Sequence, residues 1–365
     1  MDRYELRRED YSLSEDQLDL QNAYAKFFET HCTHETVHAA EPEGFDRDLW
    51  ERLCATGATT MALPERAGGD GATLVDLTLV AEEVGRYLAP VPWIDHVCAA
   101  RLLACLDVQE LAAIASGKRI VGLDPHLGNV TGSRLIPTAS IADDLIVRDG
   151  DDIVLLTFDP VPERIENLGK LPMAWVDPAD ATHRKILASG PTASTAFGRA
   201  LDEWRLLTAS ALVGLVEQAM RIAAEFAKTR YTLGVPISSL QGISHPLANM
   251  AIAVEGGRAL ARKAAWFLDN EPEVRPELAG AAFVFMTEEA SRAATMSVHV
   301  QGGLGVSTEA AASAYLVRAR GWSLAGGDPA DTARHVAQVV VKKRSAQSPV
   351  APLAPAGADA ALAAV

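Results

Sequence analysis

Long apolar runs, an excess of positive charge and a patterned set of cysteines are all absent from this 365-residue chain. No stretch of about 18 uninterrupted apolar residues occurs, and the charged N-terminus lacks the apolar core of a signal peptide, so we expect neither membrane insertion nor secretion. The 33 Lys and Arg residues against 48 Asp and Glu residues give a net charge of −15. That balance argues against a nucleic-acid partner.

The four cysteines indicate neither a disulfide framework nor a metal site. They stand at positions 32, 54, 98 and 105, form no CxxC pair and have no nearby histidine to complete a zinc pattern. We therefore expect no metal and a reducing, cytoplasmic location.

The first part of the chain has the periodicity of helices. Residues 1–116 are predicted to form an α-helical domain. Ser14-Glu-Asp-Gln17 has the form of a capping box, a helix is expected over Asp46–Ala55, and Thr73–Leu88 carries an apolar stripe that would face a core. Between the last two, Pro64–Gly71 must be a glycine-rich loop.

The spacing of apolar residues changes twice after residue 116. Residues 117–190 hold short β-rich runs, and Asp-Gly within Arg148–Asp152 suits a tight hairpin, which predicts a small antiparallel barrel or sandwich. Residues 191–344 return to a helical period in long segments, which predicts a C-terminal four-helix bundle. Residues 345–365 are predicted to be a flexible tail. The fold class is therefore mostly α with a small middle β-domain.

Two segments in the helical region have the chemistry of a cofactor site. Arg230-Tyr-Thr-Leu-Gly234 stands at a break between two long helices, where guanidinium, hydroxyl and backbone N–H groups can bind a diphosphate. Gln301-Gly-Gly-Leu-Gly305 lies between two helices, unlike a Rossmann fingerprint, which opens a helix after a strand. A solvated arginine in an interhelical loop would explain the first segment as well.

Together with the order of the three regions, these segments resemble the acyl-CoA dehydrogenase family over roughly residues 14 to 342. Pro64-Glu65, Gly68-Gly69 and the later Glu82–Arg86 are similar to its N-terminal pattern. The resemblance implies an FAD cofactor and an oligomer, because in relatives both segments contact the FAD held mainly by a neighbouring subunit. It assigns FAD-binding roles to Arg230, Thr232, Gln301, Gly302, Gly303 and Gly305.

In the β-domain the resemblance is thinner. Thr138 matches a family threonine that hydrogen-bonds the flavin, although a threonine after a proline is also an ordinary strand end. Where relatives carry a Thr-Glu pair and a glycine-serine-aspartate loop, this chain has Leu123-Asp-Pro125 and soon Asn129-Val-Thr-Gly132. The resemblance thus implies a shortened cradle for a flavin of its own.

Both catalytic-base positions of the family lack a carboxylate here. The common glutamate falls at Gly326, and an alternative base, which precedes an arginine in relatives, falls at Trp204 before Arg205. Glu203 and Asp328 are the nearest substitutes. One residue along a helix turns a side chain by about 100°, so Glu203 would point elsewhere. A solvated carboxylate explains each of them, and an arginine paired with acidic neighbours explains Arg205.

These features predict the base-lacking subunit of an α2β2 acyl-CoA dehydrogenase. Such a subunit would complete the FAD site of a base-bearing partner that oxidises an acyl-CoA to the 2,3-enoyl-CoA. The resemblance implies a bulky or steroid side-chain thioester as substrate and an electron-transfer flavoprotein as acceptor. Two alternatives stay open at this point: a homo-oligomeric, monooxygenase-like flavoenzyme and a flavin-free scaffold.

Overall fold

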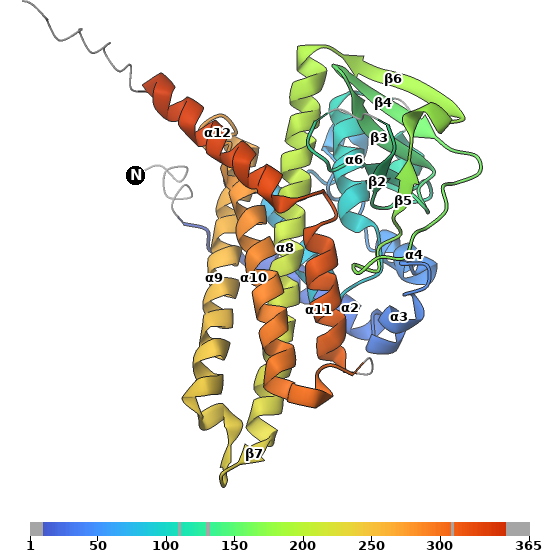
Figure 1. Ribbon diagram of the computed structural model, residues 1–365. Helices are drawn as coiled ribbons and strands as arrows, with labels where there is room; N and C mark the ends of the chain where they lie inside the picture. The colour runs from blue at the N-terminus through green and yellow to red at the C-terminus, as the bar shows by residue number, and fades with distance from the viewer. Residues whose placement is uncertain (1–9, 109–110, 129–131, 308–309, 348–365) are drawn as a thin grey trace, which may run out of the picture.

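The computed structural model describes residues 10–108, 111–128, 132–307 and 310–347. Helices dominate, with a β-region between the N-terminal helices and the C-terminal bundle (Figure 1). The N-terminal helices are α2 (Glu15–His31), α3 (His34–Ala39), α4 (Arg47–Ala55), α5 (Leu74–Arg86), α6 (Trp93–Cys105) and α7 (Leu111–Ala115). The predicted capping box opens α2: the Ser14 hydroxyl accepts from the Gln17 N–H, and the Gln17 side chain accepts from the Ser14 N–H.

The β-region contains a four-stranded sheet and a separate two-stranded one. Its strands are β1 (Val121–Leu123), β2 (Arg134–Ile136), β3 (Asp144–Asp149), β4 (Asp152–Thr157), β5 (Ala174–Val176) and β6 (His183–Ser189). The larger sheet has the order β1-β3-β4-β6, and β2 pairs with β5. The predicted hairpin joins β3 to β4 around Gly150.

One prediction for this region is wrong: the sheet is not wholly antiparallel, because β1 and β3 run parallel. The chain leaves β1, contributes β2 to the other sheet and returns as β3 beside β1. A connection of that length permits a parallel pair, which a two-residue hairpin cannot make.

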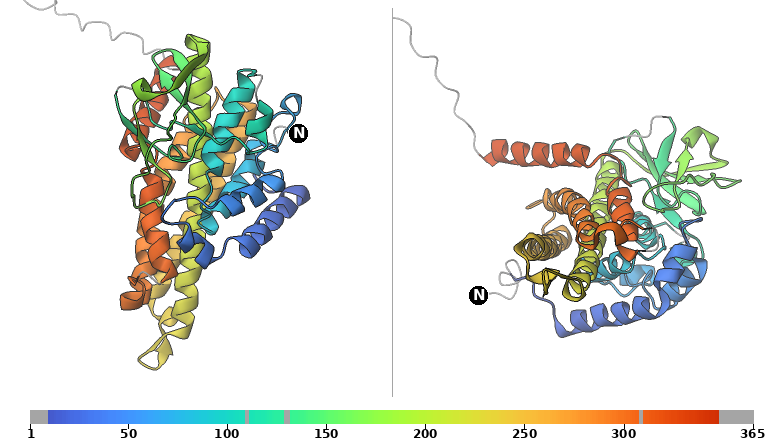
Figure 2. Two further views of the ribbon diagram at one scale, coloured as in Figure 1. Left: turned by 90° about the vertical axis from the view of Figure 1, so that its right-hand side faces the viewer. Right: turned by 60° about the horizontal axis from the view of Figure 1, so that its bottom comes forward.

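The C-terminal helices are α8 (Pro191–Thr229), α9 (Gln241–Asn270), α10 (Leu278–Gln301), α11 (Ala311–Ser323) and α12 (Pro329–Gln347). Figure 2 shows the bundle nearly end-on, with α2 running across its outside. Helix α12 continues past residue 345, where the sequence predicts a tail, and residues 348–365 of that predicted tail lie outside the described residues.

Helix α8 is the centre of the molecule. It is long and apolar enough to cross a membrane by length and composition, but 78% of its most apolar window is buried within the protein. A Cβ at Gly85 would lie 1.7 Å from the Ala211 carbonyl oxygen, and one at Gly214 would lie 1.8 Å from that of Glu82. Only glycine allows such a close approach, so α5 packs directly on α8 and joins the N-terminal helices to the bundle core.

His96 links α6 to the β-region. Its ring is fully buried, its Nε2 lies 2.9 Å from the Ile114 carbonyl oxygen, and its Nδ1 accepts a hydrogen bond from the Val121 N–H. Both ring nitrogens are therefore used by the neutral ring, and burial lowers the pKa of His96 to about 4.

We expect the destabilisation caused by His96→Gln to shrink as the pH falls. The unfolded-state pKa is near 6.5, so below that pH the parent loses stability until the pH reaches the folded value. Between pH 7 and pH 5 the difference between parent and variant should close by about 2 kcal/mol in urea unfolding. His38→Gln, at an exposed histidine, serves as the control. A constant difference would contradict a buried neutral His96.

Candidate functional site

The segment predicted to bind a diphosphate forms a small hairpin at the foot of the bundle, the end where α8 gives way to α9 (Figure 1). Strands β7 (Tyr231–Thr232) and β8 (Val235–Pro236) flank a turn in which Leu233 and Gly234 have φ of 50° and 78°. Two positive φ angles are typical of the tight turn that matches the twist of hairpin strands. The hairpin holds Arg230 and Thr232 in exposed positions.

The second predicted segment lies at the same end. Helix α10 finishes at Gln301, and Gly302–Leu304 forms a short 3-10 turn, η4. A small buried cluster of Ala223, Ala227 and Val300 holds the last turns of α8 and α10 together. The fold therefore brings together the Arg230 hairpin and the glycine loop, two segments far apart in sequence.

The geometry of the glycine loop suits a ligand supplied from outside the chain. A Cβ at Gly302 or Gly303 would meet nothing within 4 Å, so their backbone faces open space, whereas Gly305 packs against Val298. The Gln301 Nε2 is buried without a hydrogen-bond partner among the described residues. A buried amide donor left unpaired costs free energy, so an acceptor such as a phosphate or flavin oxygen would stabilise it. These residues fit one side of an FAD.

Large apolar side chains surround the two segments. The exposed members are Tyr231, Leu233 and Val235 on the hairpin and Leu304 and Val306 after the glycine loop, with Leu233 90% exposed. A monomer gains nothing by leaving them in water, and such clusters mark interaction sites. We refer to these five residues with Arg230, Thr232 and Gln301–Gly305 as the foot surface.

The centre of the chain, in contrast, is closed. Thr138 follows β2, is buried, and donates its hydroxyl to the Asp95 Oδ2 at 2.5 Å. The Asp95 Oδ1 accepts from the Trp204 Nε1 at 2.7 Å. Burial is the main influence on this carboxyl and raises the pKa of Asp95. The structure thus gives the Thr138 hydroxyl a partner inside the chain, and it does not bring Thr138 to the foot surface.

Sequence reasoning missed Asp95. Its only signal was a single acidic residue in a mostly apolar helix, Trp93–Cys105, which also carries His96 and Arg101. Such a residue is buried only where hydrogen-bond donors meet it. Those donors come from the segment after β2 and from α8, whose positions relative to α6 the sequence alone does not give.

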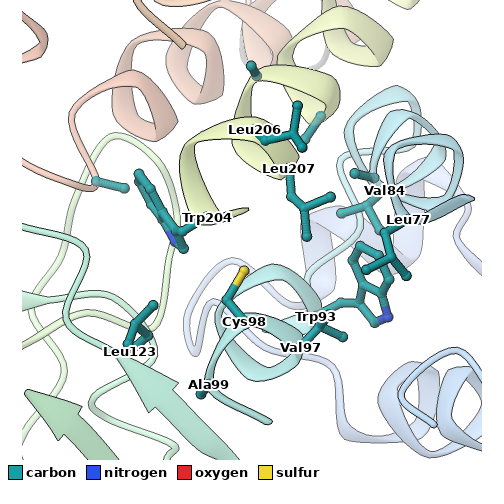
Figure 3. Packing of buried hydrophobic residues seen from close by; sticks show 14 of the residues in the cluster. Leu77, Val84, Trp93, Val97, Cys98, Ala99, Leu123, Trp204, Leu206 and Leu207 are labelled. Carbon is teal, nitrogen blue, oxygen red and sulfur yellow. The ribbon is translucent and has the colours of Figure 1, made fainter. Parts of the chain in front are cut away.

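The two positions where relatives carry a base are in contact. A Cβ at Gly326 would lie 2.9 Å from two ring carbons of Trp204. The Trp204 ring is 3% exposed and lies between α8 and the β-region near Leu123, with the α6 residue Cys98 across from it (Figure 3). The indole therefore fills the space into which a glutamate at residue 326 would project.

The two substitute carboxylates are engaged elsewhere. Glu203 forms a bidentate ion pair with Arg101: its Oε2 lies 2.8 Å from the Arg101 Nε and its Oε1 lies 3.2 Å from the Arg101 Nη2. This pair is on a different face of α8 from Trp204. Asp328 is exposed and accepts a hydrogen bond from the Ala330 N–H at the start of α12. Arg205 is buried and pairs with Asp202 at 2.7 Å. Neither carboxylate lies where a base would be needed beside Trp204.

The shortened turn after β1, residues 124–126, covers the loop that holds Gly326. Asp124 accepts hydrogen bonds from His126 and Arg134, each at 2.7 Å. A Cβ at Gly326 would lie 3.4 Å from the Pro125 carbonyl oxygen, and one at Gly327 would lie 3.2 Å from the His126 ring. The turn therefore packs on the 326–327 loop, while residues 129–131 of the predicted shortened cradle lie outside the described residues. A cavity of only about 70 Å³ remains beside Thr138 and Trp204.

Comparison with known proteins agrees with this architecture. Residues 14–106 match the acyl-CoA dehydrogenase N-terminal domain, and residues 195–341 match its C-terminal domain. The chain belongs to the acyl-CoA dehydrogenase family. The family is one of oxidoreductases, and the mostly α fold with a small β-region is the fold of its members.

Three relatives place the chain within the acyl-CoA dehydrogenases. It is 27% identical to the acyl-CoA dehydrogenase IpdE2 of Mycolicibacterium smegmatis, over 89% of this chain and 98% of that one. It is 25% identical to a chain of the ChsE4-ChsE5 complex from Mycobacterium tuberculosis, with a TM-score of 0.79 over 91% and 99% of the two chains. The Tcur3481-Tcur3483 steroid acyl-CoA dehydrogenase has the same fold, with 24% identity and a TM-score of 0.80 over 92% and 100%.

The contact between Trp204 and Gly326 predicts strong coupling between the two base positions. Gly326→Glu alone should lower the free energy of unfolding by roughly 1–3 kcal/mol through overpacking, and Trp204→Ala alone by about 3–5 kcal/mol through a cavity. In the double variant the new side chain can enter the vacated space, so the two losses should not add. Urea unfolding measures the coupling. Gly303→Glu, at a site open to solvent, is the control and should change stability little.

Proposed function

We propose that this chain is the non-catalytic subunit of a heteromeric, FAD-dependent acyl-CoA dehydrogenase. One observation carries the proposal: the chain's own centre is closed by Trp204, Asp95 and Thr138, while its foot surface is open and holds an unpaired Gln301 amide. A chain that catalysed the reaction in its own centre would need room there for substrate and flavin, which the Trp204 ring beside Gly326 removes.

The reaction requires a carboxylate that removes the proton α to the thioester, and FAD, when bound, accepts the hydride from the β-carbon. We assign the carboxylate to the partner subunit, since Gly326 and Trp204 supply none here. The role of this chain is to hold the partner's cofactor. Arg230 and Thr232 would bind its diphosphate, Gln301 would donate its free amide hydrogen, and Gly302 and Gly303 would admit the cofactor close to the backbone.

The apolar members of the foot surface support the second subunit as a partner. Leu233, Leu304 and Val306 would lose their contact with water when a subunit seats over them, which favours assembly. Names of relatives add to this, because one solved neighbour is a two-component complex and another is described as a steroid enzyme. We extend both features to this chain: an α2β2 assembly acting on a bulky, steroid-like acyl-CoA in the cytoplasm, with an electron-transfer flavoprotein as acceptor.

Co-expression with base-bearing acyl-CoA dehydrogenase chains tests the proposal. We expect one of them to co-purify in equal amount, and the pair to be yellow and to oxidise acyl-CoA thioesters. A colourless protein without a partner would indicate a scaffold. A yellow homo-oligomer active on its own would instead indicate different flavin chemistry, and either result would contradict the proposal.

A further inference from the structure

A second cavity, of about 370 Å³, lies away from both the foot surface and the closed centre. Its walls come from the loop after Ala62, from α6 and from α8. Three arginines line it, one from each of these segments: Arg66, Arg101 and Arg199. The motif Pro64–Gly71, which the proposed function does not use, forms one side.

The loop is folded so that it presents Arg66 to the cavity. A Cβ at Gly69 would lie 2.2 Å from the Leu63 carbonyl oxygen, so only glycine allows the loop to fold back on itself. The Gly71 N–H then donates to the same Leu63 oxygen at 2.9 Å. Arg66 lies beside α6, where its Nη2 is 3.4 Å from the Ala104 carbonyl oxygen.

Glu203 is the single carboxylate among the residues that line this cavity. It accepts from the Arg101 Nε at 2.8 Å and from the Arg199 Nε at 3.3 Å. Arg101 also donates to the Ala62 carbonyl oxygen at 2.7 Å. Glu203 is thus a positioning residue that holds two guanidinium groups at one site, not the base that sequence reasoning considered.

The charges do not balance. Three guanidinium groups line the cavity against one carboxylate, and Asp269, which does not line it, lies 3.9 Å from the Arg199 Nη2 and accepts a hydrogen bond from the Leu74 N–H. In a chain with a net charge of −15, this is a local site of positive potential.

We propose that this cavity binds a small phosphomonoester. Guanidinium groups bind phosphate through paired, charge-assisted hydrogen bonds, and groups from three segments can surround its tetrahedral oxygens. The cavity is several times larger than a phosphate ion, and its remaining walls include Leu102 and small side chains such as Ala72 and Ala200. It therefore has room for the organic part of the ester.

Calorimetry on the full-length chain, in the assembly in which it purifies, tests the site with inorganic phosphate, ribose 5-phosphate and ribose. Ribose 5-phosphate should bind more tightly than inorganic phosphate, and ribose should not bind. Arg66→Gln and Arg199→Gln should each weaken binding about tenfold or more. Arg221→Gln, on α8 but outside the cavity, is the matched control and should leave the affinity unchanged.

Cys105 gives a readout specific to this cavity. It lines the cavity and is exposed, whereas Cys32 and Cys98 are buried and Cys54 is half-buried. Bound ribose 5-phosphate should slow alkylation of Cys105 by the uncharged reagent iodoacetamide, measured by peptide mass spectrometry. The proposal is overturned if no phosphate compound binds at millimolar concentration. It is also overturned if binding survives Arg199→Gln but is lost in Arg230→Gln, which would place the anion at the foot surface.

Discussion

The purified chain, even when supplied with excess FAD, should oxidise acyl-CoA thioesters at least about 10²-fold more slowly than its complex with a base-bearing partner. General-base catalysis typically contributes about 10² to 10⁴-fold, and the chain has Gly326 and Trp204 at the two base positions. Trp204 also fills the space beside Gly326, so substrate has no room there. Anaerobic flavin bleaching by short, long and steroid-bearing acyl-CoA thioesters measures the reaction.

Robust turnover by the chain alone would contradict this expectation, and three variants would then locate the base. Glu203→Gln and Asp328→Asn remove the carboxylates nearest in sequence, and Asp95→Asn removes the buried carboxyl beside Thr138. If turnover survived all three, the base would be another group, and Glu41, which also lines the cavity beside Thr138 and Trp204, would be tested next. If Asp95→Asn abolished it, the closed centre would have to open during catalysis.

Arg230→Gln and Gln301→Ala should each weaken FAD binding by the assembled complex by roughly one to two decades. A charge-assisted hydrogen bond contributes about 1.5–3 kcal/mol, and each 1.4 kcal/mol is tenfold in affinity. The Arg230 side chain is exposed and the Gln301 amide has no partner within the described chain, so neither change should unfold the protein. Fluorescence titration of the apo-complex with FAD gives the affinity.

The control for these variants is Arg221→Gln, at an arginine on α8, the helix that ends just before Arg230; Arg221 pairs with Glu217. It should keep the parent's FAD affinity. Unfolding temperatures measured without FAD should agree among parent and variants, which separates lost binding from lost folding. If both Arg230→Gln and Gln301→Ala bound FAD like the parent, the foot surface would not be part of a flavin site.

Local patterns were sufficient to predict most of the secondary structure. The helices over Asp46–Ala55 and Thr73–Leu88 follow from caps and apolar spacing, which are properties of a few neighbouring residues, and both are confirmed to within two residues at each end. The Asp-Gly hairpin between β3 and β4 is confirmed for the same reason. The parallel β1–β3 pair was not predicted, because its register depends on residues more than 20 positions apart.

The same contrast between local motifs and contacts of distant segments applies to the candidate site. Their role in binding FAD stays a prediction, but the Arg230 segment and the glycine loop could be located from the sequence because each is a continuous motif. The closed centre could not, because Asp95, Thr138 and Trp204 come from three different elements and meet only in the folded chain. The sequence showed that Gly326 and Trp204 stand where relatives carry a base. Only the structure shows that the Trp204 ring occupies the space beside Gly326.

Counting flavins in the intact complex tests the central claim most directly. Native mass spectrometry gives the subunit composition, and flavin absorbance after denaturation gives the FAD content of the same sample. If this chain completes a partner's cofactor site and holds no FAD of its own, a symmetric α2β2 complex should carry about two FAD molecules. Four FAD molecules per tetramer, or a homotetramer of this chain saturated with FAD, would show that its own centre binds the cofactor and would contradict the account.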